Sequence, residues 1–185
     1  MPDFFQLLRR SRSLLLALLA SGLTLGASAE DDPPGRIGRI SWLSGTVYLS
    51  NPETGELSAA PLNQPLTSGD TLITEDGARA EIQIGAMTLR LDAGSRIEFD
   101  RIDDAQIRIF LDAGRMIAKL PTDDSRRDFV LETEPGRFTP RDTGIYRFDS
   151  DHGSISATSY FGTLRFAGKD TALDITAGES ASVWT

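Results

Sequence analysis

The sequence predicts an all-β fold, a single domain built as a rolled meander or a β-solenoid-like stack of short strands. Three observations predict it. Apolar residues alternate with polar ones in short segments, turn residues separate these segments, and one phrase recurs twenty residues apart. Beyond the first 29 residues, no long window has the period of an amphipathic helix.

The first 29 residues have the organisation of an export signal. Arg9, Arg10 and Arg12 precede an apolar stretch at 14–20, and Ala27-Ser28-Ala29 offers the small residues at which signal peptidase cleaves. The apolar stretch is shorter than the roughly 20 residues of a membrane-spanning helix, which disfavours the alternative of an uncleaved anchor. We therefore expect cleavage after Ala29, a periplasmic location and no stable membrane insertion.

Charge and cysteine content restrict the partners and the source of stability. Removal of residues 1–29 leaves 16 basic and 26 acidic side chains, a net charge of −10. Such a surface repels phosphate groups, so we expect no nucleic-acid partner and no binding to anionic lipid. The chain has no cysteine, so its stability must come from sheet packing.

The predicted domain spans residues 37–185. Residues 30–36 are charged and rich in proline and glycine, so we expect a flexible leader there. In the domain, period-two alternation predicts buried strand faces that carry Ala80, Ile82 and Ile84; Met87, Leu89 and Leu91; Ile97 and Phe99; Ile107, Ile109 and Leu111; Tyr146 and Phe148; Leu164 and Phe166; and Leu173 and Ile175.

Turn residues separate the predicted strands. Glycine tolerates positive φ and aspartate bonds to nearby backbone, so both types are common in tight turns. The residues that we predict at structural turns are Gly69, Asp70, Gly77, Gly94, Gly114 and Gly178.

A phrase of seven residues recurs in the middle of the chain. Residues 91–97, Leu-Asp-Ala-Gly-Ser-Arg-Ile, return at 111–117 as Leu-Asp-Ala-Gly-Arg-Met-Ile, with a weaker copy at 175–178. The recurrence predicts that Gly94 and Gly114 occupy equivalent corners one rung apart, with both leucines facing inward. The alternative is that common turn words coincide in an ordinary sandwich.

Several segments resemble a known family. Residues 65–74 and 76–82 resemble the opening of a FecR domain, with its Gly-Asp turn and alternating strand, and Thr88–Ile97 resembles its next phrase. Residues 141–148 occupy the place of an Arg-Gly-Thr-x-Phe phrase, here with altered order. The segment at 33–47 is similar to the start of exported proteins that extend the FecR core, so the resemblance covers about residues 33–185.

The resemblance implies a periplasmic β module. In the FecR family this module receives a signal from an outer-membrane transporter and passes it to a sigma factor through a cytoplasmic segment and a retained transmembrane helix. Only about twelve residues precede the apolar stretch here. We therefore expect the extracytoplasmic module without the anti-sigma segment, and the family's signalling role does not carry over directly.

Residues for catalysis are scarce, so we expect no enzyme and no cofactor. His152 is the single histidine, in a predicted hairpin tip, which leaves it as the only candidate for a serine-hydrolase base. Residues 178–182, Gly-Glu-Ser-Ala-Ser, imitate a nucleophile elbow without its final glycine or following helix.

Acidic side chains give weak metal or sugar-hydrolysis candidates. Asp149 and Asp151 resemble the start of a calcium loop that lacks the third acidic ligand and the distal glutamate, and calcium binding there stays open. The adjacent acids at 103–104 and at 123–124 could form a carboxylate pair, but neighbouring acids in turns point apart.

Aromatic residues and the last strand bear on binding. For Trp42, Tyr48, Tyr160, Phe161 and Trp184 a core position is favoured over a platform for glycan, although Trp42 and Tyr48 are not expected to face inward together. The final segment, 181–185, either docks in the sheet, which we favour, or offers its edge to a partner strand.

These observations predict a non-catalytic FecR-like module that binds a protein or another component of the cell envelope. The alternative is a glycan- or peptidoglycan-binding module, and a carbohydrate-active enzyme ranks last.

Overall fold

A computed structural model describes residues 35–50, 52, 54–151 and 153–185, which belong to one compact unit, Pro34–Thr185. The expected export signal and its cleavage site, and His152, lie outside the described residues. No helix among the described residues is long and apolar enough to cross a membrane.

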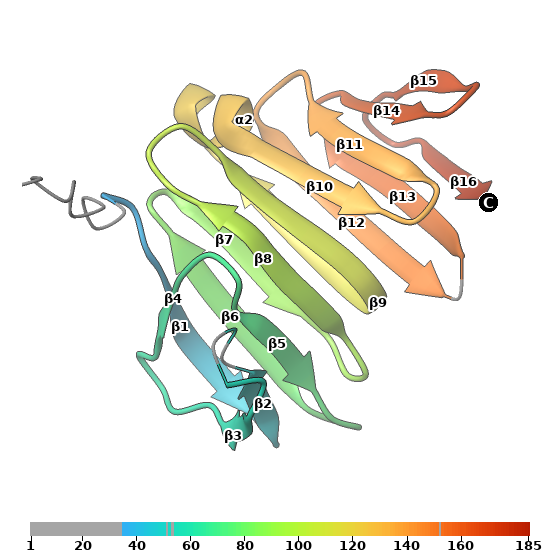
Figure 1. Ribbon diagram of the computed structural model, residues 1–185. Helices are drawn as coiled ribbons and strands as arrows, with labels where there is room; N and C mark the ends of the chain where they lie inside the picture. Colours follow the sequence, from blue (N-terminus) through green and yellow to red (C-terminus); the bar gives the residue numbers. More distant parts are fainter. Residues whose placement is uncertain (1–34, 51, 53, 152) are drawn as a thin grey trace, which may run out of the picture. The chain divides into compact units, whose positions relative to one another are not determined.

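Strands in two layers form the unit (Figure 1). Layer A contains, in spatial order, β4 (Pro65–Leu66), β1 (Gly38–Ser44), β6 (Arg79–Ile84), β7 (Met87–Leu91), the second half of β9 (Ile107–Leu120), β12 (Gly144–Asp151), β13 (Ser154–Phe161) and β16 (Ser180–Trp184). Layer B contains β3 (Leu57–Ala59), β2 (Val47–Ser50), β5 (Thr71–Thr74), β8 (Arg96–Ile102), the first half of β9, β10 (Phe129–Thr133), β11 (Gly136–Pro140), β14 (Leu164–Gly168) and β15 (Ala172–Ile175).

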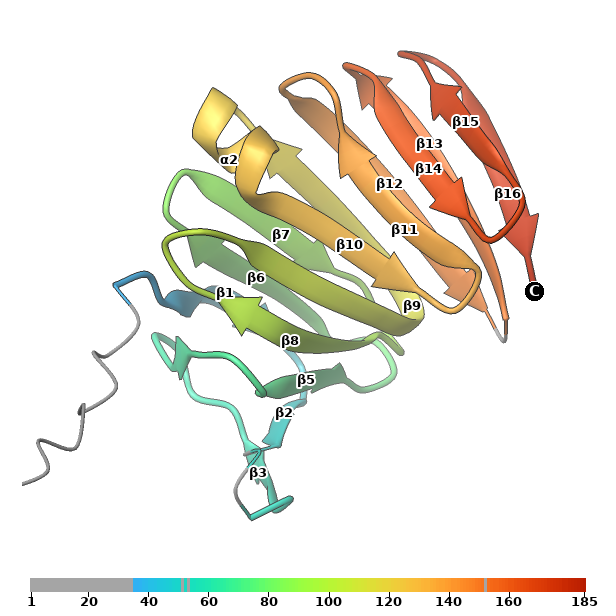
Figure 2. The ribbon, with the colours of Figure 1, turned by 45° about the horizontal axis from the view of Figure 1, so that its top comes forward.

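Strand β9 joins the two layers. Its first half pairs with β8 and β10, and its second half pairs with β7 and β12. Elsewhere the chain passes between layers through turns, many of which contain a glycine with positive φ: Gly45, Gly77, Gly94, Gly162 and Gly178. Figure 2 shows that the first strands of the chain lie at one end of the two layers and that β15 and β16 lie at the other end.

The all-β prediction is confirmed. Among the described strands, only the β9–β10 ladder is parallel. A β-solenoid stacks its rungs in parallel, so the antiparallel ladders favour the rolled meander over the solenoid.

The core lies between the layers. The apolar residues predicted at alternating positions are buried, except Leu173, which is half-buried against the core. The aromatic ring of Phe138 packs on Phe148 and Phe166, with centroid distances of 5.4 and 4.9 Å. The period-two pattern therefore identified the inward faces correctly.

Gly94 and Gly114 lie at neighbouring corners. Leu91 pairs with Met116 and Arg96 with Ala113, and both Leu91 and Leu111 are buried, as predicted. The chain crosses from layer A to layer B at Gly94 but in the opposite direction at Gly114. The prediction of stacked rungs is therefore wrong, because the two similar phrases run antiparallel.

One short helix, α2 (Asp123–Asp128), interrupts the strands of the described chain. The Thr122 hydroxyl accepts a hydrogen bond from the Ser125 amide, and the Ser125 hydroxyl accepts one from the Thr122 amide, which forms a capping box. Arg36, which the sequence assigned to the flexible leader, donates a hydrogen bond to the carboxylate of Asp128 in this helix at 2.8 Å.

Candidate functional site

The two ends of the two-layered unit differ in how their edge strands are protected. At one end, β4 has two residues, of which one is Pro65, and β3 has three residues. At the other end, β15 has four residues and β16 has five. Short strands and proline discourage pairing with another chain, so the β15–β16 end is the less protected one.

Strand β16 docks on β13, as favoured from the sequence. Val183 lies opposite Ile155, and the Thr185 amide donates to the Gly153 carbonyl at 3.0 Å. The side chains of Ala181 and Val183 pack against the core. The other edge of β16 is not paired with any described strand.

The free edge of β16 carries backbone groups at alternate positions. Along an antiparallel strand, the N–H and C=O groups of one residue point to one side, and those of the next residue point to the other side. Because Thr185 bonds toward β13, the N–H and C=O groups of Ser180, Ser182 and Trp184 point away from β13. Docking in the sheet and strand addition by a partner, the two alternatives for residues 181–185, are thus compatible. The strand docks through one edge and leaves the other edge available.

A groove of about 730 Å³ lies beside this edge, between β16 and β15. Its apolar wall is formed by Phe166, Leu173, Val183 and Trp184, and Glu134, Lys169 and Asp170 stand at its rim. A hollow of about 340 Å³ continues it past Ile175 and Ala181. We call β15, β16 and this groove the open end.

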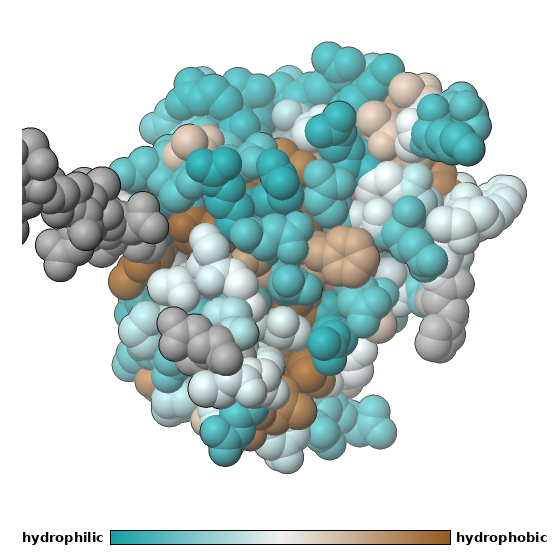
Figure 3. Space-filling view, in the orientation of Figure 1, coloured by the Kyte–Doolittle hydropathy of each residue, from teal (hydrophilic) through white to brown (hydrophobic). Residues whose placement is uncertain are grey.

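The last two strands of layer A carry no charged residue. Hydroxyl groups occupy most of their outer positions, Ser154, Ser156, Thr158, Tyr160, Ser180 and Ser182, and the hydroxyls of Thr158 and Ser180 are 2.8 Å apart. Trp184 ends this strip with 75% of its surface exposed. The face seen in Figure 3 carries many hydrophilic side chains, with neutral and apolar patches between them.

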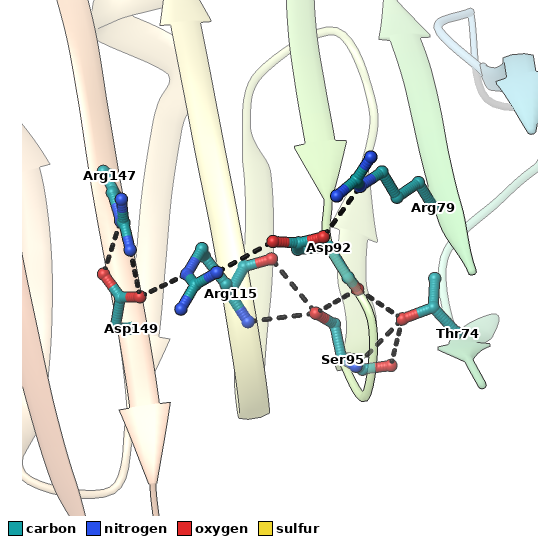
Figure 4. A network of polar contacts seen from close by, with 7 residues as sticks. All are labelled: Thr74, Arg79, Asp92, Ser95, Arg115, Arg147 and Asp149. Carbon is teal, nitrogen blue, oxygen red and sulfur yellow. Dashed lines mark hydrogen bonds and ion pairs between the residues drawn. The ribbon is translucent and has the colours of Figure 1, made fainter. Parts of the chain in front are cut away.

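In contrast, the middle of layer A carries a ladder of ion pairs (Figure 4). Asp92 accepts from Nε of Arg79 at 2.9 Å and from a terminal guanidinium nitrogen of Arg115 at 2.8 Å. Arg115 also pairs with Asp149, and Arg147 donates two hydrogen bonds to the same carboxylate at 2.7 and 2.8 Å. The ladder therefore links β6, β9 and β12 through their own side chains.

The charges in this ladder shift the carboxylate pKa values. Hydrogen bonds, chiefly from Arg79, lower the pKa of Asp92 to about 2. A hydrogen bond from Arg147, with a further one from Arg115, lowers the pKa of Asp149. Both carboxylates stay ionised at neutral pH, and their lowered pKa values mean that the ion pairs favour the folded state.

Two buried hydroxyls lie below the ladder. The Thr74 hydroxyl donates to the Asp92 carbonyl at 2.6 Å and accepts from the Ser95 amide at 2.9 Å. The Ser95 hydroxyl accepts from the Arg115 amide at 2.9 Å. These bonds join three corner segments, and Figure 4 shows them beside the ion pairs.

The structure separates the acidic candidates. Asp149, a candidate calcium ligand, faces Arg115 and Arg147. Asp103 accepts from the Ala105 and Gln106 amides in a tight turn. The pair at 123–124 begins α2. Among the described residues, no group of three potential metal-ligating side chains lies together.

The other predicted residues also have structural positions. Glu179, in the segment resembling a nucleophile elbow, accepts from the Thr176 amide, and strand β16 follows instead of a helix. Asp70 accepts from the Thr67 amide at 2.7 Å beside Gly69. Gly77 and Gly178 have positive φ in turns between the layers.

The preference for a core position of these aromatic residues is wrong. Trp42 and Trp184 are 50% and 75% exposed, Tyr160 and Phe161 are also exposed, and Tyr48 is half-buried. Trp42 lies on β1 and Trp184 on β16, with five strands of layer A between them. The tryptophans therefore do not form one platform.

The open end was missed as a site in the sequence. Its signal is the uncharged composition of residues 154–161 and 180–184 in a chain with 25% charged residues. The alternation at Leu173 and Ile175 predicted a strand with one buried face. It could not show that this strand, β15, is the last one of its layer.

Comparison with known proteins supports the fold. Two crystal structures from Parabacteroides distasonis ATCC 8503, each described as a "putative anti-sigma factor", match with TM-scores of 0.54 and 0.53. Their sequence identities are 9% and 8%, and each match covers 62% of this chain and 54% of the other. This chain thus matches about half the length of those proteins.

No family model and no curated protein matches the sequence. At such low identity the structural matches show the fold alone. That fold is consistent with the FecR resemblance, and the anti-sigma description belongs to the matched proteins.

Proposed function

We propose that this chain is a non-catalytic periplasmic module that binds a protein of the cell envelope through its open end. The observation that carries the proposal is the free edge of β16. This strand has outward backbone groups at Ser180, Ser182 and Trp184, and it lacks charge and proline. Protein partners bind such edges by adding a strand.

The groove beside the edge supports the same function. An added strand would place alternate side chains over Phe166, Leu173 and Val183, which line the groove. The description of the matched structures as anti-sigma factors supports a role in envelope sensing, because such factors act through protein contacts. A sensing module would use this surface to receive its signal.

Site-specific photo-crosslinking in the periplasm tests the proposal. A benzophenone amino acid at position 184 should form adducts with an envelope protein, whereas the same group at position 42 should form none. Both tryptophans are exposed, and they lie on strands at different ends of layer A. Equal labelling from both positions, or none from 184, would contradict the assignment.

A second candidate is glycan or peptidoglycan binding, favoured by the exposed Trp184 beside the hydroxyl groups of β13 and β16. Sugars stack on exposed aromatic rings. Titration of a Trp42→Phe variant with peptidoglycan fragments should then change Trp184 fluorescence. An unchanged spectrum eliminates this candidate.

A further inference from the structure

We propose that the open end pairs with the open end of a second copy of this chain. In this dimer, β16 aligns antiparallel with β16 of the second copy, around a two-fold axis that passes near Ser182. The inference rests on the proposed function, because it uses the same protein-binding surface, the open end. It identifies the binding partner as a second copy of the chain.

The hydrogen-bonding groups of β16 are self-complementary. A two-fold axis at Ser182 places each Ser182 opposite its counterpart and each Ser180 opposite Trp184 of the other copy. These three residues carry the outward N–H and C=O groups. Every outward group of the strand then meets an outward group of the second copy, as an antiparallel ladder requires.

The same axis brings the two grooves together. Ala181 and Val183 face the core from layer A, and Leu173 faces it from layer B. Because the axis runs perpendicular to both layers, layer A continues into layer A of the second copy, and the two β15 edges approach each other. The half-exposed apolar walls of both grooves then form one continuous core, which supplies the driving force.

Charge also fits a second copy at this edge. The complete chain has a net charge of −8, so most surfaces of two copies repel each other. Strands β13 and β16 carry no charge, and Asp174 on β15 is held by Arg141 and Arg165 of its own chain. Strand β16 therefore brings no like charges together when two copies pair, and the two acidic groups at the groove rim, Glu134 and Asp170, are partly offset by Lys169.

Sedimentation equilibrium of the mature protein over a concentration series tests the pairing. The wild-type protein should show a monomer–dimer equilibrium that shifts toward the dimer as salt screens the net charge. Ser182→Pro should be monomeric, because proline removes an outward N–H and its ring blocks the edge. The fold should survive, since proline is tolerated on an edge strand where the N–H faces solvent.

Matched variants separate pairing from folding. Ser182→Thr keeps the N–H and should dimerise as the wild type does. In a Trp42→Phe background, Trp184 emission should shift to shorter wavelength as the concentration rises, and Ser182→Pro should abolish the shift. Circular dichroism checks that each variant is folded.

A wild-type protein that stays monomeric at every concentration, or a folded Ser182→Pro variant that dimerises unchanged, overturns the inference. Crosslinking at position 184 distinguishes the two proposals. An adduct of twice the chain mass supports self-pairing, whereas an adduct with a different protein and none of twice the mass supports the proposed function and contradicts the dimer.

Discussion

The hydroxyl of Tyr146 donates a hydrogen bond to the carbonyl oxygen of Asp142, 2.7 Å away, and lies 3.3 Å from the carbonyl oxygen of Thr163. Tyr146 is fully buried on β12. It thereby joins the turn that enters β12 to the turn that leaves β13. The altered Arg-Gly-Thr-x-Phe phrase at 141–148 thus has a structural role, in which one side chain holds two crossings between the layers.

Removal of this hydroxyl should destabilise the fold. Tyr146→Phe removes the side-chain donor to the Asp142 carbonyl, at a cost of about 1–2 kcal/mol, whereas the Thr163 carbonyl keeps its hydrogen bond from the Arg141 amide. Urea unfolding measures the loss, and Tyr48→Phe at a half-buried position of β2 serves as the control. Equal stability of both variants would show that the bond is not needed.

Burial also predicts an alkaline effect. Burial raises the pKa of Tyr146 to about 12, from 10.0. The neutral form is favoured in the folded state, so its contribution is fully present below pH 10 and is lost as the pH rises toward 12. The stability difference between wild type and Tyr146→Phe should therefore shrink across this range.

Two corner glycines should differ in their tolerance of alanine. Gly114 has φ of +88°, and an added Cβ would lie 2.4 Å from the Cα of Ser95. Gly94 has φ of +66° with open space around it. Gly94→Ala should cost about 1 kcal/mol, and Gly114→Ala more than about 3 kcal/mol. Equal costs measured by thermal unfolding would contradict this description of the corner.

The ion-pair ladder predicts a stability change in acid. The folded pKa of Asp92, about 2, lies below its ordinary value of 3.8, so its contribution is present above pH 3.8 and is lost as the pH falls toward 2. Asp92→Asn should cost about 0.5–1 kcal/mol at pH 7 and low salt, since the pairs are partly exposed. The difference from wild type should disappear near pH 2.

Asp76→Asn, in the exposed turn between β5 and β6, controls for the loss of one negative charge. The cost of Asp92→Asn should also decrease at high salt. A difference from wild type that persisted unchanged at pH 2 would show that Asp92 acts through something other than its charge.

Export remains a prediction from the sequence. N-terminal sequencing of protein recovered from the periplasm should begin at Glu30, because the Ala27-Ser28-Ala29 site follows a short apolar stretch. Recovery of intact protein from the inner membrane, beginning at Met1, would reverse the predicted location.

The sequence predicted the inward faces because alternation is a local property. Leu91 and Leu111 therefore face the core as expected. The direction of each crossing is not local, and for this reason the similar phrases around Gly94 and Gly114 were wrongly expected to stack as rungs. The six-residue helix α2 was missed because it is too short to show a helical period.

The candidate site could not be predicted in full, because it is formed by the last strand of each layer and the sequence does not show which strands these are. Residues 181–185 gave the two alternatives, docking and strand addition, but only the β13–β16 register shows which edge is free. Burial of Trp42 and Trp184 was wrongly expected, because hydrophobicity does not reveal that both side chains point outward from layer A.

Amide hydrogen exchange along β16 tests the central claim, that this strand closes the core with one edge and offers the other. In dilute protein the amides of Ala181 and Val183 should exchange slowly, and those of Ser180, Ser182 and Trp184 rapidly. The rapid amides should gain protection when a partner strand covers the edge. Slow exchange at all five positions in the dilute monomer would contradict a free edge, and rapid exchange at all five would contradict docking on β13.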